Sequence, residues 1–177
     1  ISGTSGIIVL DGWGIEEMTI RKKVAVHLWW PGQTIVLNSN SQINNSNLQT
    51  IKEQDFNRNQ TIRNIDEFFI QAENYKDLKK IRPQNFQINP SWEAMIPVLD
   101  RKLPLIIHAN EKREITTAIN WGKKRNYKII LSGARDSWKL ADELAKEKIP
   151  VIYRHIFTPP VHRHDPHHIH FSAPSIL

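Results

Sequence analysis

The chain has 177 residues, of which 40% are hydrophobic and 24% charged, so it is long enough to bury a core and is not disordered by composition. The net charge of +6 comes from basic residues spread along the sequence, whereas nucleic-acid binding gathers them on one face, so we expect no nucleic-acid partner. No apolar run approaches the ~20 residues of a membrane span, which predicts no membrane partner. The absence of cysteine excludes disulfides and thiolate zinc sites.

Both ends of the sequence look cut. The chain opens on Ile1 instead of a methionine, and it closes at Leu177 in a stretch that carries no helix-stop signal. We therefore expect residues 1–177 to be the central portion of a single domain.

The first half of the chain predicts two strands, a loop and a helix. Apolar runs at 7–10 and 24–30 end at turn residues, as buried strands do, and His27 in the second run is expected to be a core histidine. Residues 38–60 are rich in Asn, Ser and Gln, so we expect a polar, exposed loop. Apolar residues then recur at intervals of three and four over 61–80, which predicts a helix.

Strand and helix alternate three times in the second half. We expect strands over 103–107, 128–131 and 150–153, and helices over 91–99, 111–124 and 136–146. Apolar strands that are each followed by a helix indicate a parallel sheet covered by helices, so the predicted fold class is α/β. Right-handed crossovers bring the carboxyl ends of these strands to one edge, where such folds carry their sites.

His108 follows the first of these strands directly. Its imidazole is expected to project from the strand end, where it can bind a metal ion or transfer a proton. The alternative is a structural histidine that a hydrogen bond holds at the strand end.

The same edge carries further polar residues. Gly133 precedes Arg135 and Asp136 in a strand-to-helix turn, whose free backbone N–H groups could hold an anion or a substrate carboxylate. The alternative is an ordinary turn in which Asp136 caps the helix. His155 follows the last strand, and we take Arg135, Asp136 and His155 as candidate substrate-binding residues.

Five of the eight histidines lie within residues 162–170. Neighbouring imidazoles can chelate a metal ion. Ordered metal ligands usually come from fixed elements, however, and this run follows Pro159 and Pro160. We therefore expect a long loop over the site, with metal capture as the alternative.

The segment PLIIHANE, followed by a helix, a strand and a second polar turn, resembles the fifth-strand region of the amidohydrolase superfamily, specifically its imidazolonepropionase-like branch. The opening ISGTSGIIVLDGWGIEEMTI and the later VAVHLWWPG look like an upstream stretch of that branch. The resemblance spans about the whole chain and is looser between Ile35 and Gln60. It implies that the chain is part of a (β/α)₈ TIM-type barrel.

The resemblance also implies a reaction. His108 matches the strand-end metal ligand. Glu111, the candidate catalytic residue, matches an acidic residue that contacts substrate or the reacting water. Zinc or another divalent ion, one or two per chain, would lower the pKa of a bound water. The resulting hydroxide would attack the carbonyl carbon of an amide or cyclic amide in a small-molecule substrate, and the C–N bond would break. By itself Glu111 is equally a first-turn carboxylate that the helix dipole favours. Assembly into a homo-oligomer stays open.

Three features depart from the family pattern. No His-x-His pair follows an apolar strand, no late-strand aspartate is identifiable, and Ser132 stands where a second strand-end histidine is expected. We expect the first two beyond the ends of the chain, whereas the third indicates a one-metal site or a divergent substrate. The rival reading is a non-catalytic or decayed barrel domain with a binding or structural role. Because one ligand cannot hold a catalytic zinc, we expect this chain alone to be inactive.

Overall fold

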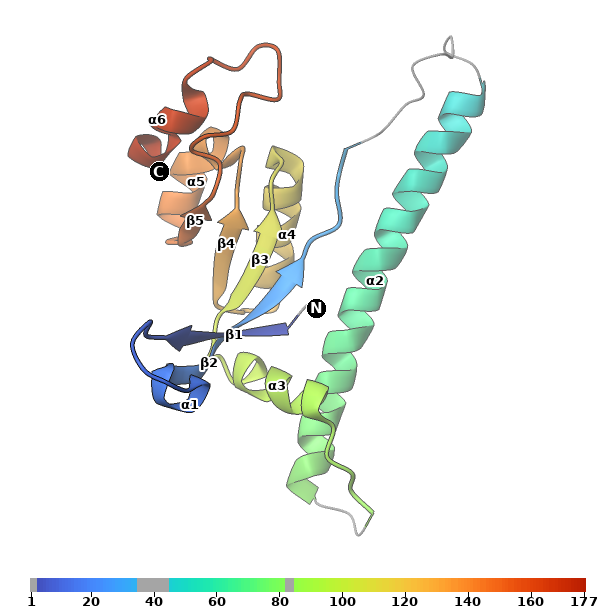
Figure 1. Ribbon diagram of the computed structural model, residues 1–177. Helices are drawn as coiled ribbons and strands as arrows, with labels where there is room; N and C mark the ends of the chain where they lie inside the picture. Colours follow the sequence, from blue (N-terminus) through green and yellow to red (C-terminus); the bar gives the residue numbers. More distant parts are fainter. Residues whose placement is uncertain (1–2, 35–44, 82–84) are drawn as a thin grey trace.

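The computed structural model describes residues 3–34, 45–81 and 85–177 and contains one curled sheet of five strands in the order β1-β2-β3-β4-β5 (Figure 1). The strands are β1 (Gly3–Ile8), β2 (Thr19–Trp29), β3 (Leu105–Ala109), β4 (Ile129–Gly133) and β5 (Val151–Tyr153). The helices are α1 (Ile15–Met18), α2 (Asn45–Ile81), α3 (Pro90–Leu99), α4 (Lys112–Lys124), α5 (Ala141–Lys146) and α6 (Ile169–Ile176), with a 3₁₀ turn, η1 (Ser137–Leu140).

Four of the five strands are parallel, which confirms the predicted α/β class. β2, β3, β4 and β5 pair in parallel, while β1 pairs antiparallel with β2. Only residues 9–18 join β1 to β2, and a parallel pair needs a crossover of about a dozen residues or more, so this connection allows only an antiparallel strand.

The strand register assigns each side chain to one face of the sheet. Leu28, Ile107 and Leu131 are paired across β2, β3 and β4, and all three are fully buried beneath the helices. Because side chains alternate along a strand, the next residues point the other way. They form a second row across the sheet, which we call the open face: Trp29, His108, Ser132 and Ile152. Trp29 is 56% exposed and Ile152 is 46% exposed, so both ends of this row are accessible.

Helix α4 forms the centre of the packed face. Ile115, Ala118 and Ile119 are fully buried, and Gly122 lies so near the sheet that a Cβ there would be 2.2 Å from Ile129 Cδ1. The helix begins where the Glu114 carboxylate accepts the backbone N–H of the N-cap residue Glu111, at 3.2 Å. This half of a capping box fixes the chain as it leaves β3.

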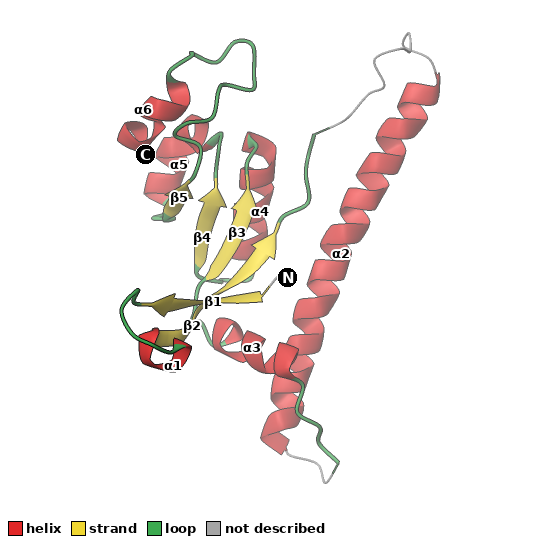
Figure 2. Cartoon of the chain, in the orientation of Figure 1, coloured by secondary structure: helices red, strands yellow, loops and turns green. Residues whose placement is uncertain are grey.

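The expectation of a polar loop over residues 38–60 is wrong for much of that range. Residues 38–44 lie outside the described part of the chain, and residues 45–60 belong to α2, which runs beside the sheet along the length of the molecule (Figure 2). Its second half buries Phe69 and Ala72 in the core, so a helix is already formed there and can propagate backwards without an apolar stripe. Side-chain hydrogen bonds at i,i+4, such as Gln49 to Glu53 at 3.2 Å, add support.

Two further elements differ from expectation. The helix predicted over 136–146 is η1 followed by the short α5. The loop expected over residues 162–170 ends at residue 168, and α6 begins at Ile169. Within the described ranges, no helix is long and apolar enough to cross a membrane.

Candidate functional site

Two histidines meet on the open face. His27 Nδ1 lies 2.9 Å from His108 Nε2, and the Trp29 ring stacks on the His108 ring at 4.2 Å between centroids. Trp29 is the register partner of His108, and His27 lies two residues earlier on the same face. The expectation that His27 is a core histidine is therefore wrong: it is half-buried and contacts the predicted metal-ligand residue.

The surroundings of His108 favour a neutral imidazole. Burial lowers the pKa of His108 below its usual value, and the nearby charges of His27 and Arg154 lower it further. Its Nδ1 atom is buried and has no hydrogen-bond partner within the described structure. A neutral imidazole with an available lone pair is the form that binds divalent metal ions.

Three of the predicted residues lie together in a second cluster. The Arg135 guanidinium is 3.6 Å from the Glu111 carboxylate and 3.7 Å from the Asp136 carboxylate. Glu111 also accepts a short hydrogen bond from the Thr34 hydroxyl, which ties the loop after β2 to the start of α4. The edge of the sheet thus brings together residues from three separate connections, as the parallel topology predicted.

The turn after β4 does not present the free amides expected of it. Gly133 has φ +86°, and Ala134 follows it at φ +54°. The Ala134 N–H donates to the Ala109 carbonyl at 2.8 Å, and the Asp136 N–H donates to the Asn110 carbonyl at 2.9 Å. Asp136 begins η1 but makes no side-chain cap bond. These amides lock β4 to β3 at the site and do not offer an anion site.

Asp136 belongs to a group that could bind a metal ion. Single ligand atoms of Asp136, His162 and Asp165 all lie within 4.8 Å of one another, and no other group of three such side chains was found among the described residues. Asp136 is 3% exposed, and its Oδ2 atom is 3.3 Å from His162 Nε2. Lys139 already supplies a positive charge here, with Nζ 3.0 Å from Asp165 and 3.8 Å from Asp136.

His155 lies in a third polar cluster at the same edge. Its Nε2–H donates to Asn110 Oδ1 at 2.9 Å, and burial together with the Arg135 charge lowers the pKa of His155. Nearby, the Tyr153 hydroxyl lies 2.7 Å from Nδ1 of the buried His170. Burial raises the pKa of Tyr153 to about 12, so this hydroxyl remains protonated and donates to the imidazole.

The structure thus places the five predicted residues in three neighbouring groups. Glu111, Arg135 and Asp136 are joined by ion pairs, His155 lies beside them, and His108 is on the open face. Within the described chain, no hydrogen bond or ion pair joins His108 to the other four. Sequence reasoning missed His27 and Asp165. The alternation of side chains along 24–30 was a signal for His27, since it puts His27 and Trp29 on one face.

Comparison with known proteins gives a likeness of fold. No family model matches the sequence, and no curated protein matches it significantly. The structure is similar to the crystal structure of an amidohydrolase from Thermotoga maritima MSB8, with a TM-score of 0.69 and 18% sequence identity. The match covers 95% of this chain and 42% of that chain. The chain therefore has the fold of part of an amidohydrolase.

Proposed function

We propose that this chain is part of a metal-dependent amidohydrolase of the imidazolonepropionase-like branch, which hydrolyses the C–N bond of an amide or cyclic amide in a small molecule. The observation that carries the proposal is the pair His27–His108, at the carboxyl edge of a sheet with an amidohydrolase fold. Catalytic groups of such folds lie at this edge. In this proposal the curled sheet closes into a (β/α)₈ barrel whose interior is the open face.

The donor set of the pair suits zinc or another divalent ion. His27 Nδ1 and His108 Nε2 would hold the ion, because both are imidazole nitrogens and they lie 2.9 Å apart. When bound, the ion lowers the pKa of a coordinated water towards neutrality. Catalytic zinc sites have three protein ligands, so this pair requires at least one more from outside the described residues.

The neighbouring residues have roles that follow from their contacts. Glu111 is a carboxylate held by Arg135 and Thr34 at the strand edge, where it can accept a proton from the substrate or the reacting water. The Arg135 side chain is 15% exposed and keeps a positive charge at this edge, which can attract a substrate oxygen. Asp136 fixes the Arg135 side chain from the other side, and His155 orients Asn110 beside it.

Metal binding by variants tests the assignment. We expect Zn²⁺ titrated calorimetrically into His108→Ala or His27→Ala to bind about tenfold more weakly than into the wild-type chain. The matched control is His164→Ala, which removes an exposed histidine of the loop and should leave the affinity unchanged. Asp165→Asn shows which of the two sites binds the Zn²⁺ that is measured. It alters the Asp136–His162–Asp165 group and leaves the His27–His108 pair intact.

The same experiment distinguishes the hydrolase proposal from the rival reading of a non-catalytic or decayed barrel domain. If the wild-type chain and His108→Ala bind Zn²⁺ equally, His108 is no ligand, and a non-catalytic or decayed barrel domain with a binding role replaces the hydrolase. Because the described residues supply only two imidazoles at the open face, we expect no metal-dependent amide hydrolysis from this chain alone.

A further inference from the structure

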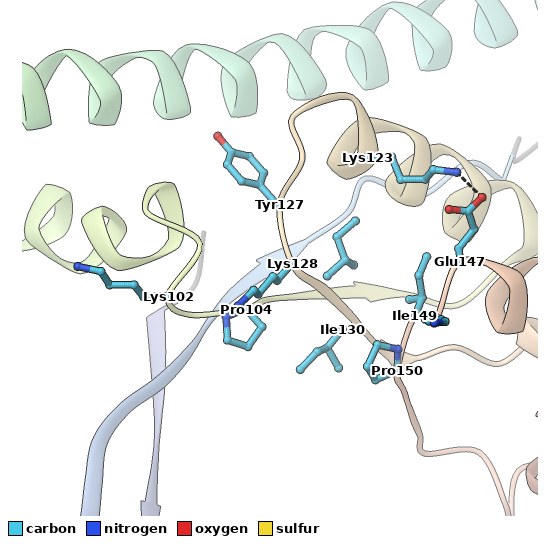
Figure 3. Close-up of a pocket in the computed structure, with 11 residues that line it drawn as sticks. Lys102, Pro104, Lys123, Tyr127, Lys128, Ile130, Glu147, Ile149 and Pro150 are labelled. Carbon is cyan, nitrogen blue, oxygen red and sulfur yellow. Dashed lines mark ion pairs between the residues drawn. The ribbon is translucent and has the colours of Figure 1, made fainter.

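A pocket of about 450 Å³ opens at the edge of the sheet opposite the histidine pair (Figure 3). It lies where β3, β4 and β5 begin, between the ends of α4 and α5, and its volume falls in the range of small-molecule sites. The lining residues are Lys102, Pro104, Lys123, Tyr127, Lys128, Ile129, Ile130, Glu147, Lys148, Ile149 and Pro150.

The walls of this pocket are apolar. Pro104 and Pro150 precede β3 and β5, and in Figure 3 Ile130 lies between them while Ile149 lies beside Pro150. Tyr127 adds an aromatic ring at one side. Such walls bind the hydrocarbon body of a ligand by removing it from water.

The rim of the pocket is basic. Four lysines line it against one carboxylate, Glu147, which is paired with Lys123 at 2.7 Å. Lys102 lies 3.6 Å from Asp100. Lys128 and Lys148 are exposed and have no carboxylate within ion-pair distance in the described part of the chain, so two positive charges at the rim are uncompensated.

We propose that this pocket binds a small organic anion with a compact apolar body, of the aryl or branched-chain carboxylate class. The apolar walls receive the body, and Lys128 and Lys148 bind the carboxylate at the rim. The site is separate from the proposed metal centre, since it is formed by the beginnings of the strands whose ends carry His108 and Arg135.

Calorimetric titration with 4-tert-butylbenzoate tests this proposal. We expect Lys128→Gln/Lys148→Gln to bind it about tenfold more weakly than the wild-type chain. The matched control is Lys22→Gln/Lys23→Gln, which removes two exposed charges from β2 and should leave the affinity unchanged. The uncharged 4-tert-butylbenzamide should bind weakly to every variant, because it lacks the charge, and acetate should bind weakly because it lacks the apolar body.

Amide chemical shifts locate the bound anion independently of affinity. The proposal requires that 4-tert-butylbenzoate perturbs Tyr127, Ile130 and Ile149 more than His108. It is overturned if the shifts cluster at His108, if the benzamide binds as tightly as the benzoate, or if both double variants bind like the wild type. These outcomes do not depend on metal binding, so the hydrolase proposal and this one can fail separately.

Discussion

His170 is the one buried histidine of the chain: all eight are described, and the other seven are half-buried or exposed. Burial lowers its pKa below the usual value, and the Arg135 charge lowers it further, against the opposing effect of Asp136 and Asp165. The charged or titratable groups that act on it are Arg135, Lys139, Asp136, Asp165 and Tyr153. His170 therefore stays neutral in the fold at a pH where it would be protonated in the unfolded chain.

We predict that His170 makes the fold less stable as the pH falls. Above its unfolded pKa of 6.5 the residue is neutral in both states and costs nothing. Below that value the unfolded chain takes up a proton more readily than the folded chain, so stability is lost until the folded pKa is reached. Urea unfolding at about pH 7.5 and about pH 5.5 measures this loss, which should be smaller in His170→Gln. An equal loss in both proteins would contradict the prediction.

Lys139 is a cation already present beside the Asp136–His162–Asp165 group. Its ammonium group is already paired with Asp165 and lies near Asp136, where a divalent cation would have to replace or oppose it. We therefore expect Lys139→Met to bind Mn²⁺ about tenfold more tightly than the wild-type chain, as measured by calorimetry. Lys146→Met, on the exposed end of α5, is the control. Unchanged affinity in Lys139→Met would mean that the group is a salt-bridge network only.

At the scale of elements, polar side chains in the second half of α2 bind the neighbouring helices. The Asp66 carboxylate accepts hydrogen bonds from Trp121 Nε1 and Arg125 Nη2 of the α4 region, both at 2.6 Å. Glu93 of α3 binds Tyr75 and Lys79 of α2. These contacts add to the burial of Phe69 and Ala72 in fixing the position of α2.

We predict that Asp66→Ala lowers the free energy of unfolding by about 2 kcal/mol, because two buried or half-buried donors lose a charged acceptor. Asp77→Ala is the comparison on the same helix. The side chains of Asp77 and of its partner Lys80 are both more than half exposed. Asp77→Ala should lower the free energy of unfolding much less than Asp66→Ala does, because water screens an exposed ion pair. Urea denaturation compares the two variants. Equal effects would show that Asp66 does not anchor α2.

The elements differ in how well the sequence predicted them, and the reason is physical. β3, α4 and β4 were predicted within a few residues because their apolar runs and helical spacing reflect their own burial. Residues 45–60 have no such pattern, and they are helical because the second half of α2 packs in the core. The antiparallel direction of β1 follows from its short connection to β2, once the bounds of the two strands are known.

In the candidate site too, some residues could be predicted from local sequence patterns, and others depend on tertiary structure. His108, Glu111 and Arg135 could be named because each follows a predicted strand of a parallel sheet. The contact of His27 with His108 depends on the register between β2 and β3, which are separated by more than seventy residues. The position of Asp165 beside Asp136 depends on how the histidine-rich loop folds back, and the sequence carries no periodic signal for that path.

At the scale of the whole molecule, the open face is accessible at its two ends. It carries Trp29 and Ile152 in one row with His108, and both apolar residues expose about half of their surface. Exposed apolar patches of this kind mark surfaces that contact another part of a protein. The chain spans 42% of the similar amidohydrolase, and in the proposed barrel further strands would cover this row.

We therefore predict that the isolated chain binds the apolar dye 8-anilinonaphthalene-1-sulfonate at the open face. Trp29→Gln/Ile152→Gln should lower the dye fluorescence by about half, because the patch loses its two largest accessible apolar side chains. Trp13→Gln is the matched control: Trp13 is fully exposed but lies outside the sheet, so its loss should change little. Thermal unfolding of each variant shows that the fold is retained. If Trp13→Gln lowers the fluorescence as much as the double variant, the dye reports scattered surface residues, and the open face is no interaction surface.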